Sequence, residues 1–320
     1  MCDKIKPMMN YFERAKFFRT KKRLGQNFLV DGEVIQDIIE YANISTEDTV
    51  VEIGPGVGFV TEQLVKYAKK VIAIELDEEA IKELKKLNAP NLEIIHNDIL
   101  KTDLSTLTDG EFKVVANIPY YITSPIIAHL LGEVDDLNNK NRNKIKDIIM
   151  MVQEEVARRM VADENSPNKQ YGLLSILSQF WADVEILRLV GRKCFYPAPK
   201  VNSALVKLDV RKEPKIKLSD YSYFRRTVKA GFAQRRKNIK NCLLNGGFLR
   251  ENVVKALETI GVDENTRGEK LSIETFGKLN VKSGMIKSRE GTSIYFHGKD
   301  NMENSNFDDS VDIAGKILYN

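Results

Sequence analysis

The 320-residue sequence has few of the residues that build disulfide frameworks or metal sites. Its three cysteines, Cys2, Cys194 and Cys242, are odd in number and far apart, and none belongs to a C-x-x-C pair. This spacing indicates neither a disulfide framework nor a zinc site, so we expect reduced thiols. The histidines likewise lack the spacing of a metal site or a nucleophilic triad: His96, His129 and His297. We expect no metal.

Long apolar runs are also missing. No stretch approaches the roughly 20 apolar residues that a membrane helix needs. The start of the chain, residues 1–6, lacks the apolar segment of a secretory signal. We therefore expect a cytoplasmic protein with no membrane partner.

Basic residues are concentrated in two segments, although the net charge is only +4. Residues 211–250 hold twelve Lys or Arg against two acids, and residues 1–26 hold eight against two. Such an excess cannot be neutralised within its own segment, so it favours a polyanion such as nucleic acid as a partner. A solvated basic surface that only aids solubility would give the same composition.

Short β-branched runs alternate with apolar helical stretches from about residue 31. We predict strands over 49–53, 70–75, 92–96, 112–116, 146–152, 183–190 and 203–210. We predict helices over 33–42, 59–68, 77–87, 123–132, 153–162 and 172–181. This alternation is typical of βαβ units on a mostly parallel sheet. Because only a Pro-rich loop joins the last two strands, they are expected to form an antiparallel hairpin at the sheet edge.

The β pattern stops near Glu213-Pro214, and short helices separated by glycines follow over 219–232, 235–245, 250–259 and 272–280. Residues 138–146 are polar and basic, and we expect a loop there that forms an insertion or an RNA-facing edge. From Ser283 the chain is polar and without pattern, as in a flexible tail. We divide the chain into a basic arm (1–21), a sheet domain (22–212), a helical domain (213–282) and a tail (283–320).

A glycine-rich turn follows the first predicted strand of the sheet. The strand at 49–53 runs directly into Gly54-Pro55-Gly56-Val57-Gly58, and open α/β sheets bind ligands at such carboxyl ends. Glycines there allow the backbone to approach the ligand closely. Phe59 stands where the dinucleotide fingerprint G-x-G-x-x-G needs its third glycine. The turn therefore predicts a nucleoside cofactor other than NAD.

Carboxylates stand at the ends of the next two strands. Glu75 lies about 20 residues after the first glycine, where it can accept hydrogen bonds from both hydroxyls of a ribose. Asp98 ends the third strand and can accept from the exocyclic amine of adenine. An acid at a strand end is often only the cap of the next helix. Three consecutive matching strand ends favour the cofactor site.

Asn117-Ile118-Pro119-Tyr120 ends the fourth strand. The Asn117 side-chain oxygen and the Ile118 carbonyl, kept extended by Pro119, can both accept from an aromatic amine and aim its lone pair at a sulfonium methyl. Tyr120 can stack on a base that has left its helix, and Phe195, in a stiff Pro-rich loop, can close the opposite face. A simple strand-to-loop stop would also explain the tetrapeptide. Together with the cofactor turn, the pattern predicts methyl transfer to a nucleobase nitrogen.

These residues resemble the KsgA (RsmA) family of small-subunit ribosomal RNA adenine dimethyltransferases, over residues 14 to 282. The matching motifs cover residues 22–29, 52–58, 75–77, 97–98, 117–120, 195–204 and 232–238. The resemblance implies a Rossmann-like class I methyltransferase sheet with a small C-terminal helical domain, and S-adenosylmethionine as methyl donor. It further implies N6,N6-dimethylation of two adjacent adenosines near the 3′ end of 16S rRNA, on the immature 30S subunit. We expect a monomer.

The resemblance also implies roles for individual positions. The cofactor residues would be Gln26, Asn27, Leu29, Gly54, Gly56, Glu75, Asp98, Ile99 and Asn117. The catalytic residues would be Asn117, Pro119, Tyr120 and Phe195. Residues of the basic arm and the helical domain would bind RNA: Lys21, Lys22, Arg23, Arg225, Arg226, Arg235, Arg236 and Lys237.

Two other functions fit part of the pattern. The Erm group methylates a large-subunit rRNA adenine with similar motifs, although residues 24–26, 195–204 and 232–238 look more like the small-subunit family. A non-catalytic assembly factor would use the same fold only to dock RNA. The intact Gly54, Glu75, Asp98 and Asn117 favour an enzyme.

Overall fold

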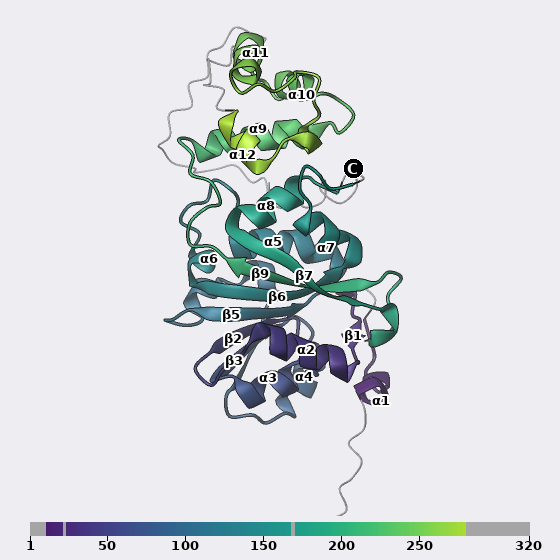
Figure 1. The fold of residues 1–320 in the computed structure, drawn as a ribbon. Coiled ribbons are helices and arrows are strands. Elements are labelled where there is room, and N and C mark those ends of the chain that lie inside the picture. The colour runs from purple at the N-terminus through teal and green to yellow at the C-terminus, as the bar shows by residue number, and fades with distance from the viewer. Residues whose placement is uncertain (1–10, 22–23, 168–169, 280–320) are drawn as a thin grey trace, which may run out of the picture. The chain divides into compact units, whose positions relative to one another are not determined.

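The computed structural model describes residues 11–21, 24–167 and 170–279, which fall into two compact units (Figure 1). Unit 1 holds the described residues up to Gly132 together with Asn138–Val161 and Trp181–Glu213. Unit 2 holds Glu133–Leu137, Ala162–Phe180 and the described residues from Pro214 on. The division of the chain into four parts stays a prediction, and residues 1–10 of its arm and its tail over 283–320 lie outside the described residues.

Unit 1 is built on a seven-stranded sheet with the order β4-β3-β2-β5-β6-β9-β7. Five adjacent strands run parallel to one another: β2 (Thr49–Ile53), β3 (Lys70–Glu75), β4 (Leu92–His96), β5 (Phe112–Asn117) and β6 (Ile145–Gln153). Strand β9 (Ser203–Val210) lies antiparallel between β6 and the edge strand β7 (Ala182–Val190). The predicted α/β class and the antiparallel pair at the edge are confirmed.

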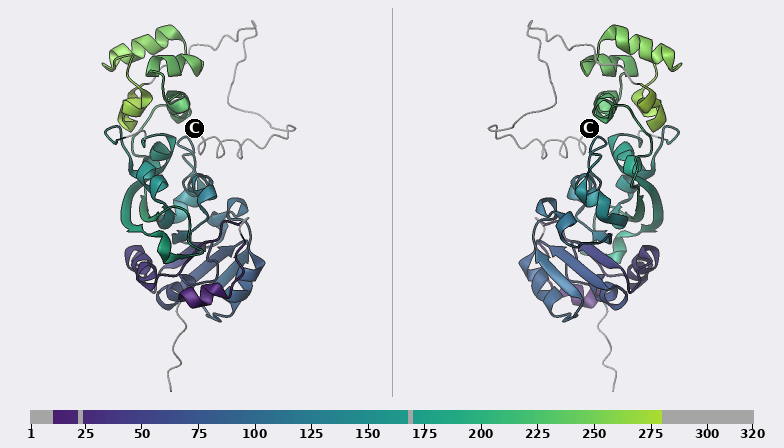
Figure 2. Two further views of the ribbon diagram at one scale, coloured as in Figure 1. Left: turned by 90° about the vertical axis from the view of Figure 1, so that its right-hand side faces the viewer. Right: turned by 90° about the vertical axis from the view of Figure 1, so that its left-hand side faces the viewer.

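Helices cover both faces of this sheet (Figure 2). They are α2 (Gly32–Ala42), α3 (Thr61–Tyr67), α4 (Glu78–Lys85), α5 (Thr123–Leu131), α6 (Lys140–Lys144) and α7 (Glu154–Val161). Asp31 caps the start of helix α2, because its Oδ1 accepts hydrogen bonds from the backbone N–H groups of Glu33 and Val34. Its Ile35 and Ile38 are buried in a core shared with α3 and the strands beneath. Burial of this apolar side holds the helix on the sheet.

A polar loop predicted over 138–146 is wrong, because helix α6 occupies most of the segment. The Asn139 side chain caps the helix by accepting from the Arg142 backbone N–H at 2.8 Å. Arg142 is only 1% exposed. Its Nη1 donates to the Leu131 carbonyl at 2.6 Å, and its guanidinium lies 3.5 Å from the centroid of the Trp181 ring. A guanidinium group can be buried when an aromatic ring and a carbonyl oxygen are its partners. The basic composition of this segment therefore did not mean that all its basic side chains are exposed.

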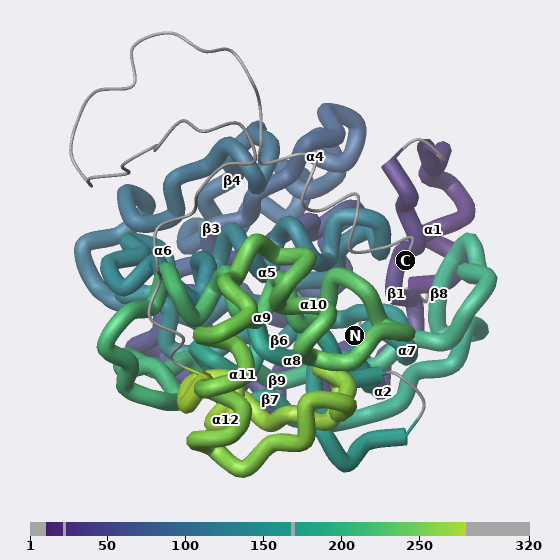
Figure 3. The backbone as a smooth tube through the Cα atoms, turned by 90° about the horizontal axis from the view of Figure 1, so that it is seen from above, coloured from purple at the N-terminus to yellow at the C-terminus, as the bar shows by residue number. Residues whose placement is uncertain are grey.

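A small two-stranded sheet joins the start of the described chain to a segment far along it. Strand β1 (Phe28–Leu29) pairs antiparallel with β8 (Phe195–Tyr196), and α1 (Tyr11–Lys16) lies beside them (Figure 3). Strands of two residues are too short to leave a periodic signal, so the sequence did not predict them.

Unit 2 is helical and contains α9 (Tyr221–Ala233), α10 (Ile239–Asn245), α11 (Arg250–Thr259) and α12 (Ile273–Lys278). Most of α8 (Leu173–Trp181) belongs to it as well. Aromatic side chains form part of its core, since the Phe180 and Phe224 rings stack at 5.3 Å. Short 3-10 helices span Ile99–Lys101, Leu104–Thr106, Tyr120–Ile122, Arg192–Cys194 and Gly268–Lys270. Within the described ranges, no helix has the length and apolar character needed to cross a membrane.

Candidate active site

The carboxyl ends of β2, β3, β4 and β5 meet at one cavity of unit 1, because parallel neighbours end at the same edge of a sheet. The cavity measures about 1050 Å³, counted out to its open mouth. All but one of the predicted cofactor and catalytic residues line it: Gln26, Asn27, Leu29, Gly54, Gly56, Glu75, Asp98, Ile99, Asn117, Pro119 and Tyr120. The exception is Phe195.

The glycine turn forms the floor of the cavity. Gly54 and Gly56 have φ angles of +68° and +57°, a region that side chains with a Cβ rarely adopt. A Cβ on Gly56 would lie 2.8 Å from Cε1 of Phe28, closer than carbon atoms pack. The Gly54 N–H donates to the Ile74 carbonyl at 3.0 Å, which fixes the turn to β3. The turn therefore needs glycine both for its backbone angles and for space.

Backbone groups hold the Glu75 carboxylate in place at the end of β3. Its Oε1 accepts from the Leu76 and Asp77 N–H groups at 2.9 and 2.8 Å, and its Oε2 accepts from the Gly56 N–H at 2.9 Å. Burial raises the pKa of Glu75, and these hydrogen bonds oppose the shift only in part. A carboxylate has about four acceptor sites, so these three bonds leave capacity for a ligand hydroxyl. Three backbone N–H groups thus fix the orientation of this acceptor.

A second carboxyl group, Glu52 of β2, also lines the cavity and was given no role from the sequence. Glu52 is 3% exposed, and its Oε2 has no hydrogen-bond partner in the part of the chain that the structure describes. Burial raises its pKa from 4.5 to about 8; the nearby Thr61 hydroxyl opposes this shift and the charge of Glu75 adds to it. Glu52 is therefore mostly protonated at neutral pH. The signal in the sequence was an acid inside the apolar strand Thr49–Ile53.

Asp98 follows β4 and lies where both readings of the sequence place it, and its contact with adenine stays a prediction. Its Oδ1 accepts from the Leu100 N–H at 3.0 Å, so it caps the short helix Ile99–Lys101, and it also lines the cavity. Leu76 lines the cavity too and is half exposed, which gives this end an apolar surface. The sequence did not single out Leu76.

The tetrapeptide after β5 lines the cavity as predicted by its position. Tyr120 begins the short helix Tyr120–Ile122, and its hydroxyl is hydrogen-bonded to Oγ of the buried Ser203. Burial raises the pKa of Tyr120 and the Ser203 hydroxyl opposes the shift, so the phenol stays neutral. Tyr121, which is 54% exposed, also lines the cavity and was missed.

Phe195 is not at the cavity surface. It lies in β8 opposite Leu29, is 2% exposed and belongs to the core around α2. Its role as a stacking partner stays a prediction. Tyr121, which lines the cavity, has a more accessible aromatic ring than Phe195.

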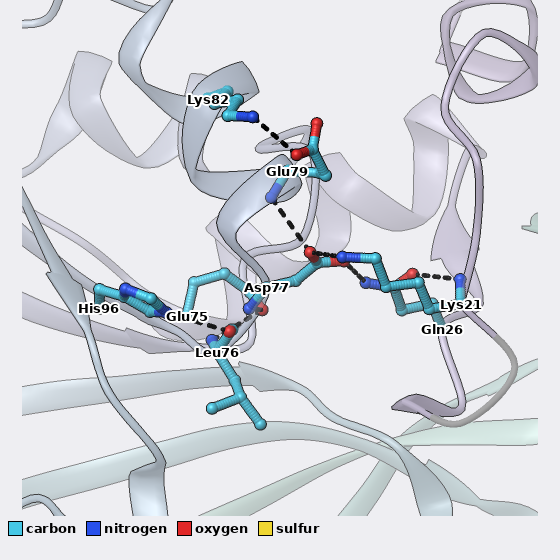
Figure 4. Close-up of polar contacts among 8 residues, drawn as sticks. All are labelled: Lys21, Gln26, Glu75, Leu76, Asp77, Glu79, Lys82 and His96. Atoms are coloured by element: carbon cyan, nitrogen blue, oxygen red, sulfur yellow. Dashed lines mark hydrogen bonds and ion pairs between the residues drawn. The ribbon is translucent and has the colours of Figure 1, made fainter.

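The segment before β1 is tied to the end of β3. The Gln26 side chain donates to Oδ2 of Asp77 at 2.7 Å and accepts from the Lys21 N–H at 2.8 Å (Figure 4). The Lys21 ammonium forms an ion pair with Oδ1 of Asp77. Lys21 is thus engaged inside unit 1, although the sequence suggested an RNA contact. Lys22 and Arg23 lie outside the described residues.

The other predicted RNA residues lie in unit 2 and differ in their surroundings. Nε of Arg225 lies 3.1 Å from Glu133 and 3.4 Å from Asp135, so much of its charge is balanced. Arg226 is exposed, with its guanidinium 5.3 Å from the centroid of the Phe248 ring. The turn between α9 and α10 holds three basic residues, Arg235, Arg236 and Lys237. Of these, Arg236 and Lys237 are exposed. Their roles stay predictions.

Comparison with known proteins shows one consistent similarity. Residues 17–281 match the family described as Ribosomal RNA adenine dimethylase. The chain is 44% identical over 281 residues to Ribosomal RNA small subunit methyltransferase A of Clostridium botulinum (strain Loch Maree), which covers 86% of this chain and 96% of that protein. It is 42% identical to the protein of the same name from Bacillus licheniformis, and the match covers 82% of this chain and 91% of that protein.

Two solved structures share the fold over most of the chain. A dimethyladenosine transferase from Plasmodium falciparum has a TM-score of 0.62 and 30% identity, covering 78% of this chain and 94% of that one. The 23S rRNA methyltransferase ErmE has a TM-score of 0.61 and 29% identity, covering 79% and 98%.

Proposed function

The chain belongs to the ribosomal RNA adenine dimethylase family, and we propose that it methylates 16S rRNA during maturation of the 30S subunit. It transfers methyl groups from S-adenosylmethionine to N6 of two adjacent adenosines near the 3′ end, giving N6,N6-dimethyladenosine. The observation that carries this proposal is the single cavity at which the glycine turn, Glu75, Asp98 and the tetrapeptide 117–120 meet. The relatives named for the small subunit support the choice of RNA.

The cavity residues fit S-adenosylmethionine. When bound, it supplies an electrophilic methyl group on a sulfonium centre. The glycine turn leaves room for the ligand, and the preset Glu75 carboxylate accepts from ribose hydroxyls. Asp98 and Ile99 would frame the adenine, and Gln26, Asn27 and Leu29, which line the same cavity, would close over the methionine end.

The target amine is held by the tetrapeptide. The Asn117 side-chain oxygen and the Ile118 carbonyl accept its two hydrogens and turn its lone pair toward the methyl group. Tyr120, a neutral phenol held by Ser203, stacks on the flipped base. Pro119 fixes the backbone between these groups.

The RNA is held chiefly through charge. Exposed cations of unit 2, such as Arg226, Arg236 and Lys237, contact phosphates of the small-subunit RNA. We further propose that the protein acts as a cytoplasmic monomer. Its partner is the partly assembled 30S subunit.

Mass spectrometry of methylated RNA tests the assignment. The purified protein and S-adenosylmethionine are incubated either with 30S particles from a strain that lacks this protein or with protein-free 23S RNA. We expect dimethyladenosine in the 3′ fragment of 16S RNA and none in 23S RNA. Methylation of 23S RNA alone would assign the chain to the function named for ErmE instead.

The Asn117→Ala variant separates the enzyme from a non-catalytic assembly factor. Because Asn117 supplies an acceptor for the amine, we expect methylation to fall at least 100-fold while RNA affinity is unchanged. A non-catalytic assembly factor would give the opposite result: 16S RNA left unmethylated by the wild-type protein, and normal 30S maturation in cells that carry only Asn117→Ala.

A further inference from the structure

We propose that Asp77 is a positioning residue that, through Lys21 and Gln26, holds the arm segment (here Lys21 together with residues 24–29) beside the cofactor cavity. These three residues, Lys21, Gln26 and Asp77, are called the Asp77 clasp. The inference rests on the proposed use of the cavity for S-adenosylmethionine. It gives Lys21 a role in the cofactor site in place of an RNA contact.

Both oxygens of Asp77 are used, and its side chain is 0% exposed. Oδ1 accepts from the Glu79 N–H at 3.1 Å and pairs with the Lys21 ammonium, while Oδ2 accepts from Nε2 of Gln26 at 2.7 Å. Figure 4 shows Lys21 and Gln26 meeting at Asp77 from one side and α4 from the other. A helix cap needs only the bond to Glu79. The other two contacts come from residues more than 50 positions away in the chain.

The charge of Asp77 is balanced by this geometry. Burial alone would raise its pKa, but the hydrogen bonds from Lys21, Gln26 and the Glu79 N–H, together with the charge of Lys21, outweigh that effect and the pKa is lowered. Asp77 is therefore ionised at neutral pH. A buried carboxylate that loses its cation is strongly destabilised, so the arm segment and the end of β3 hold each other in place.

The clasp links Gln26, which lines the cavity, to the backbone beside Glu75. The backbone N–H of Asp77 donates to Glu75, the proposed ribose acceptor. Its side chain holds Gln26, which lines the cavity together with its neighbours Asn27 and Phe28. One residue thus fixes the distance between the arm segment and the ribose acceptor. Loss of the side-chain contacts leaves the backbone bond to Glu75 in place and frees the arm side.

Binding of S-adenosylmethionine, measured by calorimetry without RNA, tests the clasp. Asp77→Asn keeps the shape and an acceptor for the helix cap but removes the charge. We expect it to raise the Kd at least 10-fold, since a charge-assisted contact is lost on one side of the ligand. Lys21→Met, which changes a partly exposed residue, should raise the Kd by a similar factor. The double variant should be little worse than either single variant, because both remove the same interaction.

An exposed ion pair on helix α4, which Asp77 caps, provides the matched control. Nζ of Lys82 lies 2.7 Å from Oε1 of Glu79, and both side chains are more than half exposed (Figure 4). Glu79→Gln and Lys82→Met should leave the Kd unchanged. In turnover assays the clasp variants should raise KM for S-adenosylmethionine while kcat at saturation stays within about 2-fold.

The outcomes separate the clasp from the proposed function. An unchanged Kd in both Asp77→Asn and Lys21→Met, or an equal rise in the control pair, overturns the clasp. Weaker RNA binding by Lys21→Met with an unchanged Kd for S-adenosylmethionine also overturns it and restores Lys21 to the RNA surface. If the wild-type protein itself does not bind S-adenosylmethionine, the cofactor proposal fails and the clasp with it. If Asp77→Asn does not fold, Lys21→Met decides alone.

Discussion

The buried Glu52 makes the stability of the cofactor-free protein depend on pH in a defined direction. Its folded-state pKa of about 8 lies above the ordinary value of 4.5. Between these two values the folded protein keeps a proton that the unfolded chain has released. The free energy of unfolding therefore falls as pH rises from about 4.5 to about 8, and this contribution is constant outside that range.

The size of the effect follows from the same interval. Each pKa unit corresponds to about 1.4 kcal/mol. The interval between the two pKa values therefore limits the loss in free energy of unfolding to about 5 kcal/mol. Relaxation of the open cavity and entry of water reduce this figure, and we expect a loss of about 2–3 kcal/mol between pH 5 and pH 8. Glu52→Gln, which has a similar shape and cannot ionise, should remove it.

Urea unfolding of the cofactor-free protein measures the difference. The single tryptophan, Trp181, is buried, so its fluorescence reports the unfolding of unit 1. The variant should match the wild type at pH 5 and be about 2–3 kcal/mol more stable at pH 8. Glu79→Gln, an exposed change, should follow the wild type at both values. Parallel pH profiles of Glu52→Gln and the wild type would refute the reasoning.

Three further predictions follow from the cavity and the basic turn. Gly56→Ala forces a side chain into a left-handed backbone and a space too small for it. The Kd for S-adenosylmethionine should therefore rise at least 10-fold, and the free energy of unfolding should fall by about 1–3 kcal/mol. An unchanged Kd in calorimetry would contradict a close approach of the Gly56 backbone to the cofactor. Ser203→Ala removes the partner of the Tyr120 hydroxyl, so kcat should fall about 3- to 10-fold with KM for S-adenosylmethionine unchanged; a change confined to that KM would place Tyr120 on the cofactor instead. Charge reversal of Arg236 and Lys237 should weaken RNA binding and reduce its salt slope by about 1 for each lost phosphate contact, whereas equal affinities across a salt series would remove both from the RNA surface.

The sequence predicted the parts of the fold that depend on local pattern. The bounds of β2, β3 and β4 agree with the runs at 49–53, 70–75 and 92–96. Strands β2 and β3 are almost wholly buried and need nearly continuous apolar, β-branched residues, so their limits are visible in the sequence. Strand β4 lies at the sheet edge and is only partly buried, but its apolar residues Leu92, Ile94 and Ile95 still mark it. Because parallel neighbours end at the same edge of a sheet, the meeting of their carboxyl ends could also be predicted.

Features that depend on distant partners were not predictable in this way. The burial of Arg142 depends on Trp181, and the roles of Lys21 and Gln26 depend on Asp77. Neither pairing follows a spacing along the chain. The protonation of Glu52 requires knowledge of how completely the neighbouring strands enclose it.

The reversed direction of β9 gives the sheet edge at the cavity a contribution that a wholly parallel sheet would lack. Parallel strands bring only their last residues to this edge, whereas an antiparallel strand brings its first. Ser203 opens β9 beside Gln153, the last residue of β6, and from there it reaches the Tyr120 hydroxyl. One strand inserted backwards thus lets a late part of the chain support an aromatic ring supplied by a much earlier part.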